Sequence, residues 1–508
     1  MEFIRSFFSY DPREPMLFTH MYFWLFFAVL MVGYVLIYKK NAWRNAYLFL
    51  FSLFFYWKSG GHFFTILIFS TIVDYFIGRM IYTKTTEWKR KWLVAASITV
   101  NLGLLAYFKY AYFFTGVWND IFGTSHEVVD LLALWTNNLT GSNFTVENII
   151  LPVGISFFTF QTISYTVDVY RRKVKAVNNI IDFGFYVSFF PQLVAGPIVR
   201  AADFVPQLYI KYQLKKEEFG IAIFLILNGL IKKMLISDFI SVNFVDRVFA
   251  NPDLYSGFEN LLSVYGYGLQ IYCDFSGYTD IAIGVALLLG FRLPVNFNSP
   301  YKAENITDFW RRWHISLSSW LRDYLYIPLG GNRKGRIRTY INLMITMLLG
   351  GLWHGAAWRF VIWGALHGIG LAVHKMWRKA FGIPQKQRSG WHHFIAVFIT
   401  FNLVNFAWIF FRAKDMDVIG RMLSQIGKTF SADHLKQIPE VISAYGHIFG
   451  LMLAGYIIHW LPKSFKAKYT KWFVDTPWYV KVLAAIITAF VLYQVKSADI
   501  QPFIYFQF

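Results

Sequence analysis

The stretch that decides the fold runs from residue 341 to residue 374 and reads INLMITMLLGGLWHGAAWRFVIWGALHGIGLAVH. It contains a single charged residue, Arg359, and exceeds the roughly 20 apolar residues that a helix needs to cross a bilayer. Comparable apolar segments occur near residues 18–38, 62–82, 92–114, 219–241, 259–290, 391–411, 447–461 and 478–495. The sequence therefore predicts an all-α protein that crosses a membrane many times.

The composition of the 508-residue chain leads to the same class. It is 56% hydrophobic and only 15% charged, whereas ordinary soluble domains carry roughly 25% charged residues. This excludes a soluble globular enzyme and a disordered protein, and the single Cys273 excludes a disulfide scaffold. We attribute the net charge of +20 to basic loops beside anionic lipid, and we expect no nucleic-acid partner. We expect residues 1–508 to form a single membrane domain.

The distribution of Lys and Arg predicts the orientation, because basic loops stay in the cytoplasm. Basic clusters lie at residues 39–44, 84–91 and 171–175, whereas the loop at residues 115–148 contains neither Lys nor Arg. We therefore expect that loop, together with the N-terminus, to lie outside the cytoplasm.

Polar residues interrupt the apolar pattern between residues 303 and 330. At 3.6 residues per turn, Arg311, His314, Ser318 and Arg322 share one helix face, opposite a face of Trp, Leu and Tyr. One interpretation is an interfacial amphipathic helix with its Trp residues among the lipid headgroups. The other is a stripe that lines a wet cavity for an anionic substrate, since Arg suits phosphate. Both can hold at once.

His354 is the strongest functional candidate within the apolar run. A His inside a membrane segment is costly to bury, and it lies between Gly351 and Gly355, which permit close approach of a backbone or a ligand. Its neighbour Trp353 is placed to shape a pocket. A structural His bonded to a nearby carbonyl remains the alternative.

His367 is a weaker candidate, because of helix geometry. The two residues are thirteen positions apart, which at about 100° per residue is three full turns plus roughly 220°. On one unbroken helix, His367 would therefore face away from His354. We interpret the spacing of Gly364 and Gly368 around it as helix packing.

Charged residues also occur in apolar surroundings at two other places. Lys232 and Lys233 are expected to extend to the membrane interface. For Asp274 and Asp280, pairing with a nearby Arg or helix capping is favoured over a place in a tunnel wall. No zinc-binding His-Glu-x-x-His or Gly-x-Ser-x-Gly motif occurs, so we predict no metal site, and the chemistry would depend on His.

Several motifs carry a family resemblance: LPVGISFFTFQ at 151–161, FPQLVAGPI at 190–198, DFWRRWHISLS at 308–318 and GGLWHG at 350–355. With these motifs the chain resembles the membrane-bound O-acyltransferase superfamily, in its alginate O-acetyltransferase-like bacterial branch, from about residue 45 to the C-terminal residues 503–508. The resemblance implies roughly 11–13 transmembrane or re-entrant helical elements around a central tunnel. It also implies a catalytic core at approximately residues 145–410, with His354 as the essential catalytic residue and His314 as the second polar site residue.

The resemblance also implies the reaction. The donor would be acetyl-CoA from the cytoplasm, with no cofactor, and the acetyl group would leave on the outer side of the inner cell membrane toward a polysaccharide. An extracytoplasmic partner of the SGNH-hydrolase type would complete the transfer. Related branches acetylate peptidoglycan or move D-alanine onto teichoic acids.

These expectations give a mechanistic hypothesis. His354 removes a proton from the attacking hydroxyl, and His314 polarises the thioester carbonyl. Arg311 would hold CoA phosphates, and Ser318, Trp353 and Asp274 complete the candidate substrate-binding residues. Three alternatives remain open: attack by His354 itself to form an acyl-imidazole, a transporter or flippase for a polysaccharide or another solute, and a structural scaffold.

Overall fold

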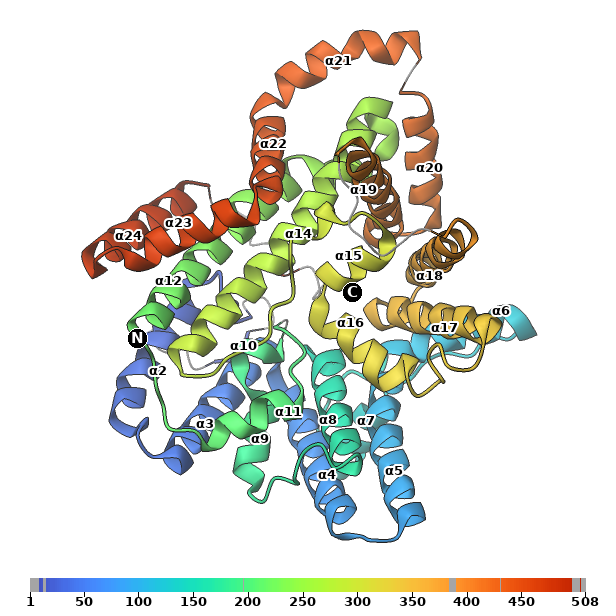
Figure 1. Ribbon diagram of the computed structural model, residues 1–508. Helices are drawn as coiled ribbons and strands as arrows, with labels where there is room; N and C mark the ends of the chain where they lie inside the picture. Colours follow the sequence, from blue (N-terminus) through green and yellow to red (C-terminus); the bar gives the residue numbers. More distant parts are fainter. Residues whose placement is uncertain are drawn as a thin grey trace. The chain divides into compact units, whose positions relative to one another are not determined.

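The computed structural model describes residues 9–11, 15–194, 196–382, 390–429, 431–495 and 503. Every regular element within these residues is helical, which confirms the expected all-α class (Figure 1). The C-terminal residues 504–508, which share the family resemblance, lie outside the described residues.

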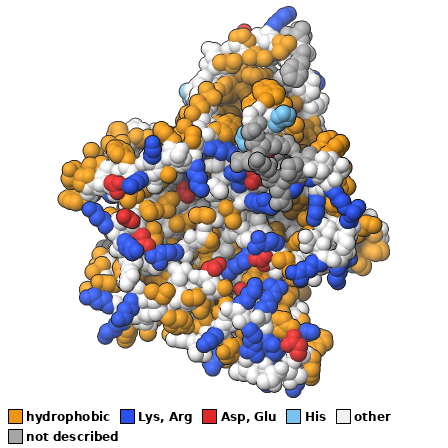
Figure 2. Space-filling model, viewed as in Figure 1, with side chains coloured by type: hydrophobic (Ala, Val, Ile, Leu, Met, Phe, Trp, Pro, Cys, Tyr) orange, Lys and Arg blue, Asp and Glu red, His pale blue; other side chains and the backbone are white. Residues whose placement is uncertain are grey.

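Six helical stretches among the described residues are long and apolar enough to cross a membrane. They are Asn41–Thr83, Glu87–Phe122, Lys216–Ala250, Gly257–Leu288, Gly390–Arg412 and Trp478–Val495. A seventh results if Leu435–Ala444 and Gly446–Trp460, which meet at a bend of 86°, form one span. Figure 2 shows hydrophobic side chains over much of the face in view, with Lys and Arg more frequent than Asp and Glu. The chain is therefore a multi-pass membrane protein.

The described residues fall into two compact units. The first contains the residues up to Val194, together with Ile198–Tyr212 and Gly355–Ala357. Its helices are α2 (Met21–Ile37), α3 (Asn41–Gly60), α4 (Phe64–Thr83), α5 (Glu87–Leu105), α6 (Ala111–Phe122), α7 (Leu131–Thr140), α8 (Ile155–Tyr170), α9 (Ile180–Ser188), α10 (Phe190–Leu193) and α11 (Ala201–Phe204).

Buried polar side chains join the helices of the first unit. Asp74 of α4 accepts hydrogen bonds from Ser97 and Asn101 of α5, at 2.6 and 2.7 Å. Because lipid offers no hydrogen-bond partners, such polar groups are satisfied between helices and fix how the helices pack.

The second unit contains chiefly Gln213–His354 and the described residues from Trp358 onward. Its helices are α12 (Lys216–Leu230), α13 (Asp246–Ala250), α14 (Gly257–Leu288), α15 (Ile306–Arg312), α16 (Ile315–Leu321), α17 (Arg336–His354), α18 (Trp358–Ala380), α19 (Gly390–Arg412), α20 (Met416–Gly427), α21 (Ala432–Ala444), α22 (Gly446–Trp460), α23 (Lys463–Asp475) and α24 (Trp478–Val495). A π-helical segment, Ile231–Asp238, continues α12.

Helices α12 and α14 run side by side in the second unit (Figure 1). A Cβ atom on Gly277 would collide with the Gly229 carbonyl, and one on Gly284 would collide with the Ala222 carbonyl. These small residues let the two backbones approach closely, as is common between membrane helices. Helix α14 therefore forms a buried axis on which the neighbouring elements pack.

The polar stretch 303–330 is not one helix, so the predicted face of Arg311, His314, Ser318 and Arg322 is wrong. Helix α15 ends at Arg312, and α16 begins at Ile315. Between them, His314 has a φ of 43° and a ψ of 54°, in the left-handed region that non-glycine residues rarely adopt. The reversal leaves Arg311 exposed and turns His314 into the interior.

The apolar run 341–374 is likewise divided, into α17 and α18. A Cβ atom on Gly351 would collide with the Phe360 carbonyl, and one on Gly364 would collide with the Met347 carbonyl. The interpretation of Gly364 as a helix-packing residue is thus confirmed. Because the helix ends at His354, the rotation that placed His367 away from His354 does not apply.

Candidate functional site

His354 is the last residue of α17, and its side chain is surrounded by aromatic rings. Its ring centroid lies 5.0 Å from that of Trp353, 5.1 Å from that of Trp363 on α18 and 5.1 Å from that of Phe411 on α19. The residue is only 3% exposed. The end of α17 therefore delivers this imidazole into a packed aromatic environment.

His314, at the reversal between α15 and α16, lies beside His354. The two ring centroids are 6.5 Å apart, and Trp353 contacts both rings. On its other side, His314 packs edge-on against Phe275 of α14, at 4.6 Å. The structure thus brings together the two imidazoles that the sequence singled out, with Trp353 alongside them.

Burial determines the charge of His314. The side chain is fully buried, and loss of water contact lowers its pKa to about 3. The ring is therefore neutral at physiological pH, with one nitrogen that donates a hydrogen bond and one that accepts. A neutral imidazole is suited to polarise a carbonyl group without carrying a buried charge.

The other predicted site residues lie in different surroundings. Arg311 is exposed and is not part of the aromatic cluster around His354. Ser318 donates a hydrogen bond to the Trp313 carbonyl at 3.1 Å, which ties α16 to the residue before His314. Asp274 pairs with Lys233.

A buried ionic cluster joins α14 to the π-helical segment 231–238. Lys233 Nζ donates to Asp274 at 2.5 Å and to Asp238 at 2.7 Å, and the Lys233 side chain is 3% exposed. Lys232 pairs with Asp280 at 2.7 Å. The prediction that Lys233 extends to the interface is wrong, because Asp274 of α14 binds it in the interior. For Lys232, whose side chain is 21% exposed, an interfacial position stays a prediction. Pairing of Asp274 is confirmed, with Lys233 in place of an Arg.

On α18, the sequence analysis set His367 aside by helix geometry and did not single out Trp363. Their ring centroids are 4.7 Å apart, and Trp363 in turn contacts His354. The missed signal is Gly355, since a glycine after a helical run is a common helix end. A break there would have cancelled the argument that His367 faces away.

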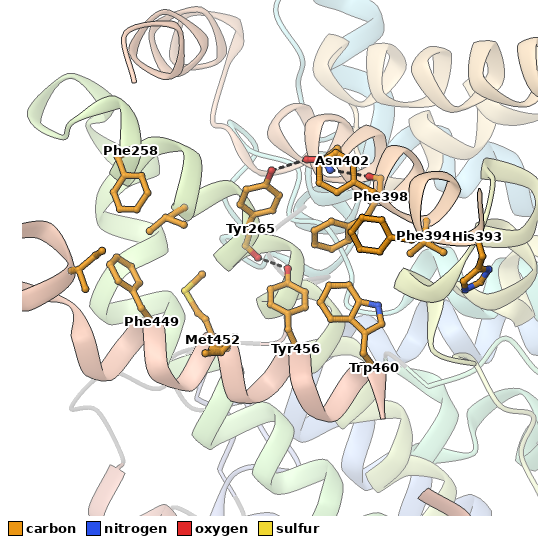
Figure 3. Close-up of a pocket in the computed structure, with 15 residues that line it drawn as sticks. Phe258, Tyr265, His393, Phe394, Phe398, Asn402, Phe449, Met452, Tyr456 and Trp460 are labelled. Atoms are coloured by element: carbon orange, nitrogen blue, oxygen red, sulfur yellow. Dashed lines mark hydrogen bonds between the residues drawn. The ribbon is translucent and has the colours of Figure 1, made fainter. Parts of the chain in front are cut away.

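A second feature of this unit is an apolar cavity of about 840 Å³ between α14, α19 and α22 (Figure 3). Tyr265 donates to Asn402 at 2.6 Å, and Tyr456 donates to the Tyr265 carbonyl at 2.7 Å. Because these polar groups bond to one another, the lining is chiefly hydrocarbon. The cavity contains neither His314 nor His354 and is thus separate from the candidate site.

Among the residues that the structure describes, no group of three or more His, Cys, Asp or Glu side chains is arranged to hold a metal ion.

Comparison with known proteins adds independent information. Residues 170–413 match the model of MBOAT, the membrane-bound O-acyltransferase family. The chain is 38% identical over 429 residues to the peptidoglycan O-acetyltransferase of Helicobacter pylori, which covers 78% of this chain and 77% of that protein. It is 40% identical over 411 residues to the protein named "Probable alginate O-acetylase AlgI" of Pseudomonas aeruginosa, and the aligned region covers 80% of this chain and 73% of that protein.

A more distant similarity extends to the teichoic acid D-alanyltransferase of Bacillus subtilis. The identity is 31% over 285 residues, which cover 53% of this chain and 70% of that protein. The matched region 170–413 includes both imidazoles, the ionic cluster and α18.

Proposed function

The chain belongs to the membrane-bound O-acyltransferase family and is an O-acetyltransferase. From this premise we propose that it moves an acetyl group from cytoplasmic acetyl-CoA across the membrane toward hydroxyl groups of an extracytoplasmic polysaccharide, by way of a partner protein. The observation that carries the proposal is the pair of His314 and His354, whose rings lie 6.5 Å apart in the interior of the second unit. Acyl transfer from a thioester needs one proton acceptor and one hydrogen-bond donor, and this pair offers both.

In the proposed reaction, His354 is the general base. It accepts the proton of the attacking hydroxyl while the hydroxyl oxygen bonds to the thioester carbon. When the tetrahedral intermediate collapses, the carbon–sulfur bond breaks, and the sulfur leaves with the proton that His354 returns. The products are the acetyl ester and free CoA, so His354 ends the cycle as it began.

His314 is the proposed donor to the thioester carbonyl oxygen. Its neutral ring offers an N–H group, and its low exposure removes competing water. Phe275 and Trp353 hold the ring from two sides. Direct attack by His354, with an acyl-imidazole intermediate, is the second version of this mechanism.

The remaining predicted residues receive different roles. Arg311 is exposed, and we assign it to binding of the CoA phosphates, because its planar guanidinium can donate two parallel hydrogen bonds to one phosphate group. Ser318 and Asp274 are positioning residues: Ser318 bonds the Trp313 carbonyl next to His314, and Asp274 anchors α14, whose Phe275 packs on His314.

The proposal includes a membrane orientation and a partner. We propose that the loop at 115–148 and the N-terminus lie outside the cytoplasm, which the distribution of the basic clusters supports, and that the protein lies in the inner membrane. An extracytoplasmic SGNH-type protein would receive the acetyl group and complete its transfer. The polymer belongs to the polysaccharide class, since relatives of comparable identity are named for alginate and for peptidoglycan.

The test uses native membranes supplied with radiolabelled acetyl-CoA, with release of free thiol and labelling of polymer as readouts. The H354A variant is expected to lose at least about 100-fold in thiol release, because a general base contributes about 10²–10⁴ in rate. The matched control is H126A, which removes an exposed imidazole in the loop at 115–148. Thiol release at the normal rate in H354A would contradict the proposal. Solute movement independent of acetyl-CoA would favour a transporter.

A further inference from the structure

His367 and Trp363 lie one turn apart on α18, both are almost fully buried, and Trp363 contacts His354. Their exposed fractions are 2% and 1%. The Trp363 ring lies between the imidazoles of His354 and His367, with centroid distances of 5.1 Å to His354 and 4.7 Å to His367. The three rings thus form one continuous group in which His354 lies at one end.

A hydrogen bond from Trp310 fixes the tautomer of His367. The Trp310 Nε1 atom lies 3.2 Å from His367 Nδ1. An indole N–H group only donates, so Nδ1 must accept and therefore carries no proton. In this neutral ring the proton is on Nε2, and Phe309 stacks against the ring at an interplanar angle of 15° to hold its orientation. Nε2 of His367 is thus an oriented hydrogen-bond donor.

Two buried donors in this group have no acceptor among the described residues: His367 Nε2 and Trp363 Nε1. Buried polar groups in folded proteins are almost always hydrogen-bonded, because an unsatisfied donor is unfavourable. Both donors are on rings that adjoin each other, and one of those rings touches the proposed catalytic base. Acceptor atoms on a bound substrate would satisfy both donors.

We propose that His367 Nε2 and Trp363 Nε1 bind amide carbonyl oxygens in the pantetheine arm of the acyl-CoA donor, and so place its thioester beside His354. This inference rests on the proposed function. The arm is a narrow, uncharged chain with two amide carbonyls, each of which is a hydrogen-bond acceptor. The rings packed on His367 are uncharged as well: Phe309, Trp310, Trp363 and Trp408. This environment suits an amide chain and does not suit a phosphate.

Two substitutions at His367 separate ligand binding from a structural role. In H367N, the amide oxygen takes the place of Nδ1 and still accepts from Trp310, but no donor remains at the Nε2 position. In H367Q, the amide nitrogen takes the place of Nε2, but the acceptor for Trp310 is lost. The probe is free CoA, which retains both amides and is not turned over, and its Kd for the purified protein is measured by calorimetry.

We expect H367N to weaken CoA binding about tenfold, the factor that corresponds to one lost hydrogen bond, and H367Q to stay within about threefold of the wild type. W363F is expected to match H367N, whereas W377F, which removes an exposed indole from the same helix, should bind CoA normally. In acetyl-CoA turnover, the loss in H367N and W363F should appear in KM and leave kcat within about threefold.

The reverse order, with H367Q weak and H367N normal, would assign His367 a structural role and overturn the proposal. Equal CoA affinity in all variants would overturn it as well. Failure of the proposed function has a different signature, since the wild type would then release no thiol from acetyl-CoA.

Discussion

Replacement of Lys233 by Met is predicted to destabilise the second unit strongly. Lys233 Nζ bonds Asp274 at 2.5 Å and Asp238 at 2.7 Å, and the side chains of Lys233 and Asp274 are 3% and 5% exposed. Met has a similar length and fills the same space, so the change removes the charge with little loss of packing. Two carboxylates then share a dry site without a cation.

The magnitude follows from the burial of the pair. Removal of one partner of a buried ion pair costs about 3–5 kcal/mol, because the other charge is left without compensation. Each 1.4 kcal/mol or so changes an equilibrium constant tenfold, so the equilibrium constant between folded and unfolded protein falls by more than about 100-fold. The assay is denaturant titration of the purified protein in detergent micelles, followed by tryptophan fluorescence. The matched variant K232M breaks the ion pair between Lys232 and Asp280, whose side chains are 21% and 19% exposed, respectively. Because that pair is less buried, K232M should lose less stability than K233M.

A compensated variant makes the prediction specific to charge. The triple change K233M/D238N/D274N removes all three charges and is expected to recover most of the lost stability. Wild-type stability in K233M would refute the assignment of a dry ionic cluster. A triple variant as unstable as K233M would attribute the loss to packing.

Three further predictions concern the elements around the imidazoles. Because burial lowers the pKa of His314 to about 3 from an unfolded value near 6.5, the unfolded chain binds an extra proton between these values. Stability should therefore fall by up to about 1.4 kcal/mol per pH unit as pH decreases through that window, and H314N should show a shallower slope in denaturant midpoints measured from pH 4 to pH 6. G364A should cost about 1–3 kcal/mol, since its Cβ would collide with the Met347 carbonyl, whereas G103A, with open space around it, should be neutral or slightly stabilising in the same titration. N305A should cost about 1 kcal/mol, because the Asn305 side chain accepts from the Asp308 N–H group at 2.9 Å and caps α15; an unchanged midpoint would show that this cap contributes nothing.

The sequence was sufficient to predict the helical membrane class, because that class depends on apolar length and low charge, which are sums over many residues. It was also sufficient to single out His314 and His354, since an imidazole among apolar residues needs an explanation. Their proximity could not be worked out from periodicity, because it depends on the reversal at His314 and on the end of α17 at His354.

Predictions from helical periodicity were wrong where a helix ends inside a segment that was treated as one continuous helix. Arg311, His314 and Ser318 share a face only on a continuous helix, and His367 faces away from His354 only on a continuous helix. The fate of Lys233 depends on a carboxylate 41 positions away, on α14, and no local pattern specifies that contact. Two of the wrong predictions therefore come from helix breaks, and the third comes from a tertiary partner.

The most direct test of the central claim is the acetyl content of cell-surface polymer in cells that carry H354A in place of the wild-type protein. We expect polymer acetylation to be abolished while the amount of protein in the membrane stays unchanged, and we expect H126A cells to acetylate normally. Full acetylation in H354A cells, at equal protein level, would remove this imidazole from the chemistry and contradict the account.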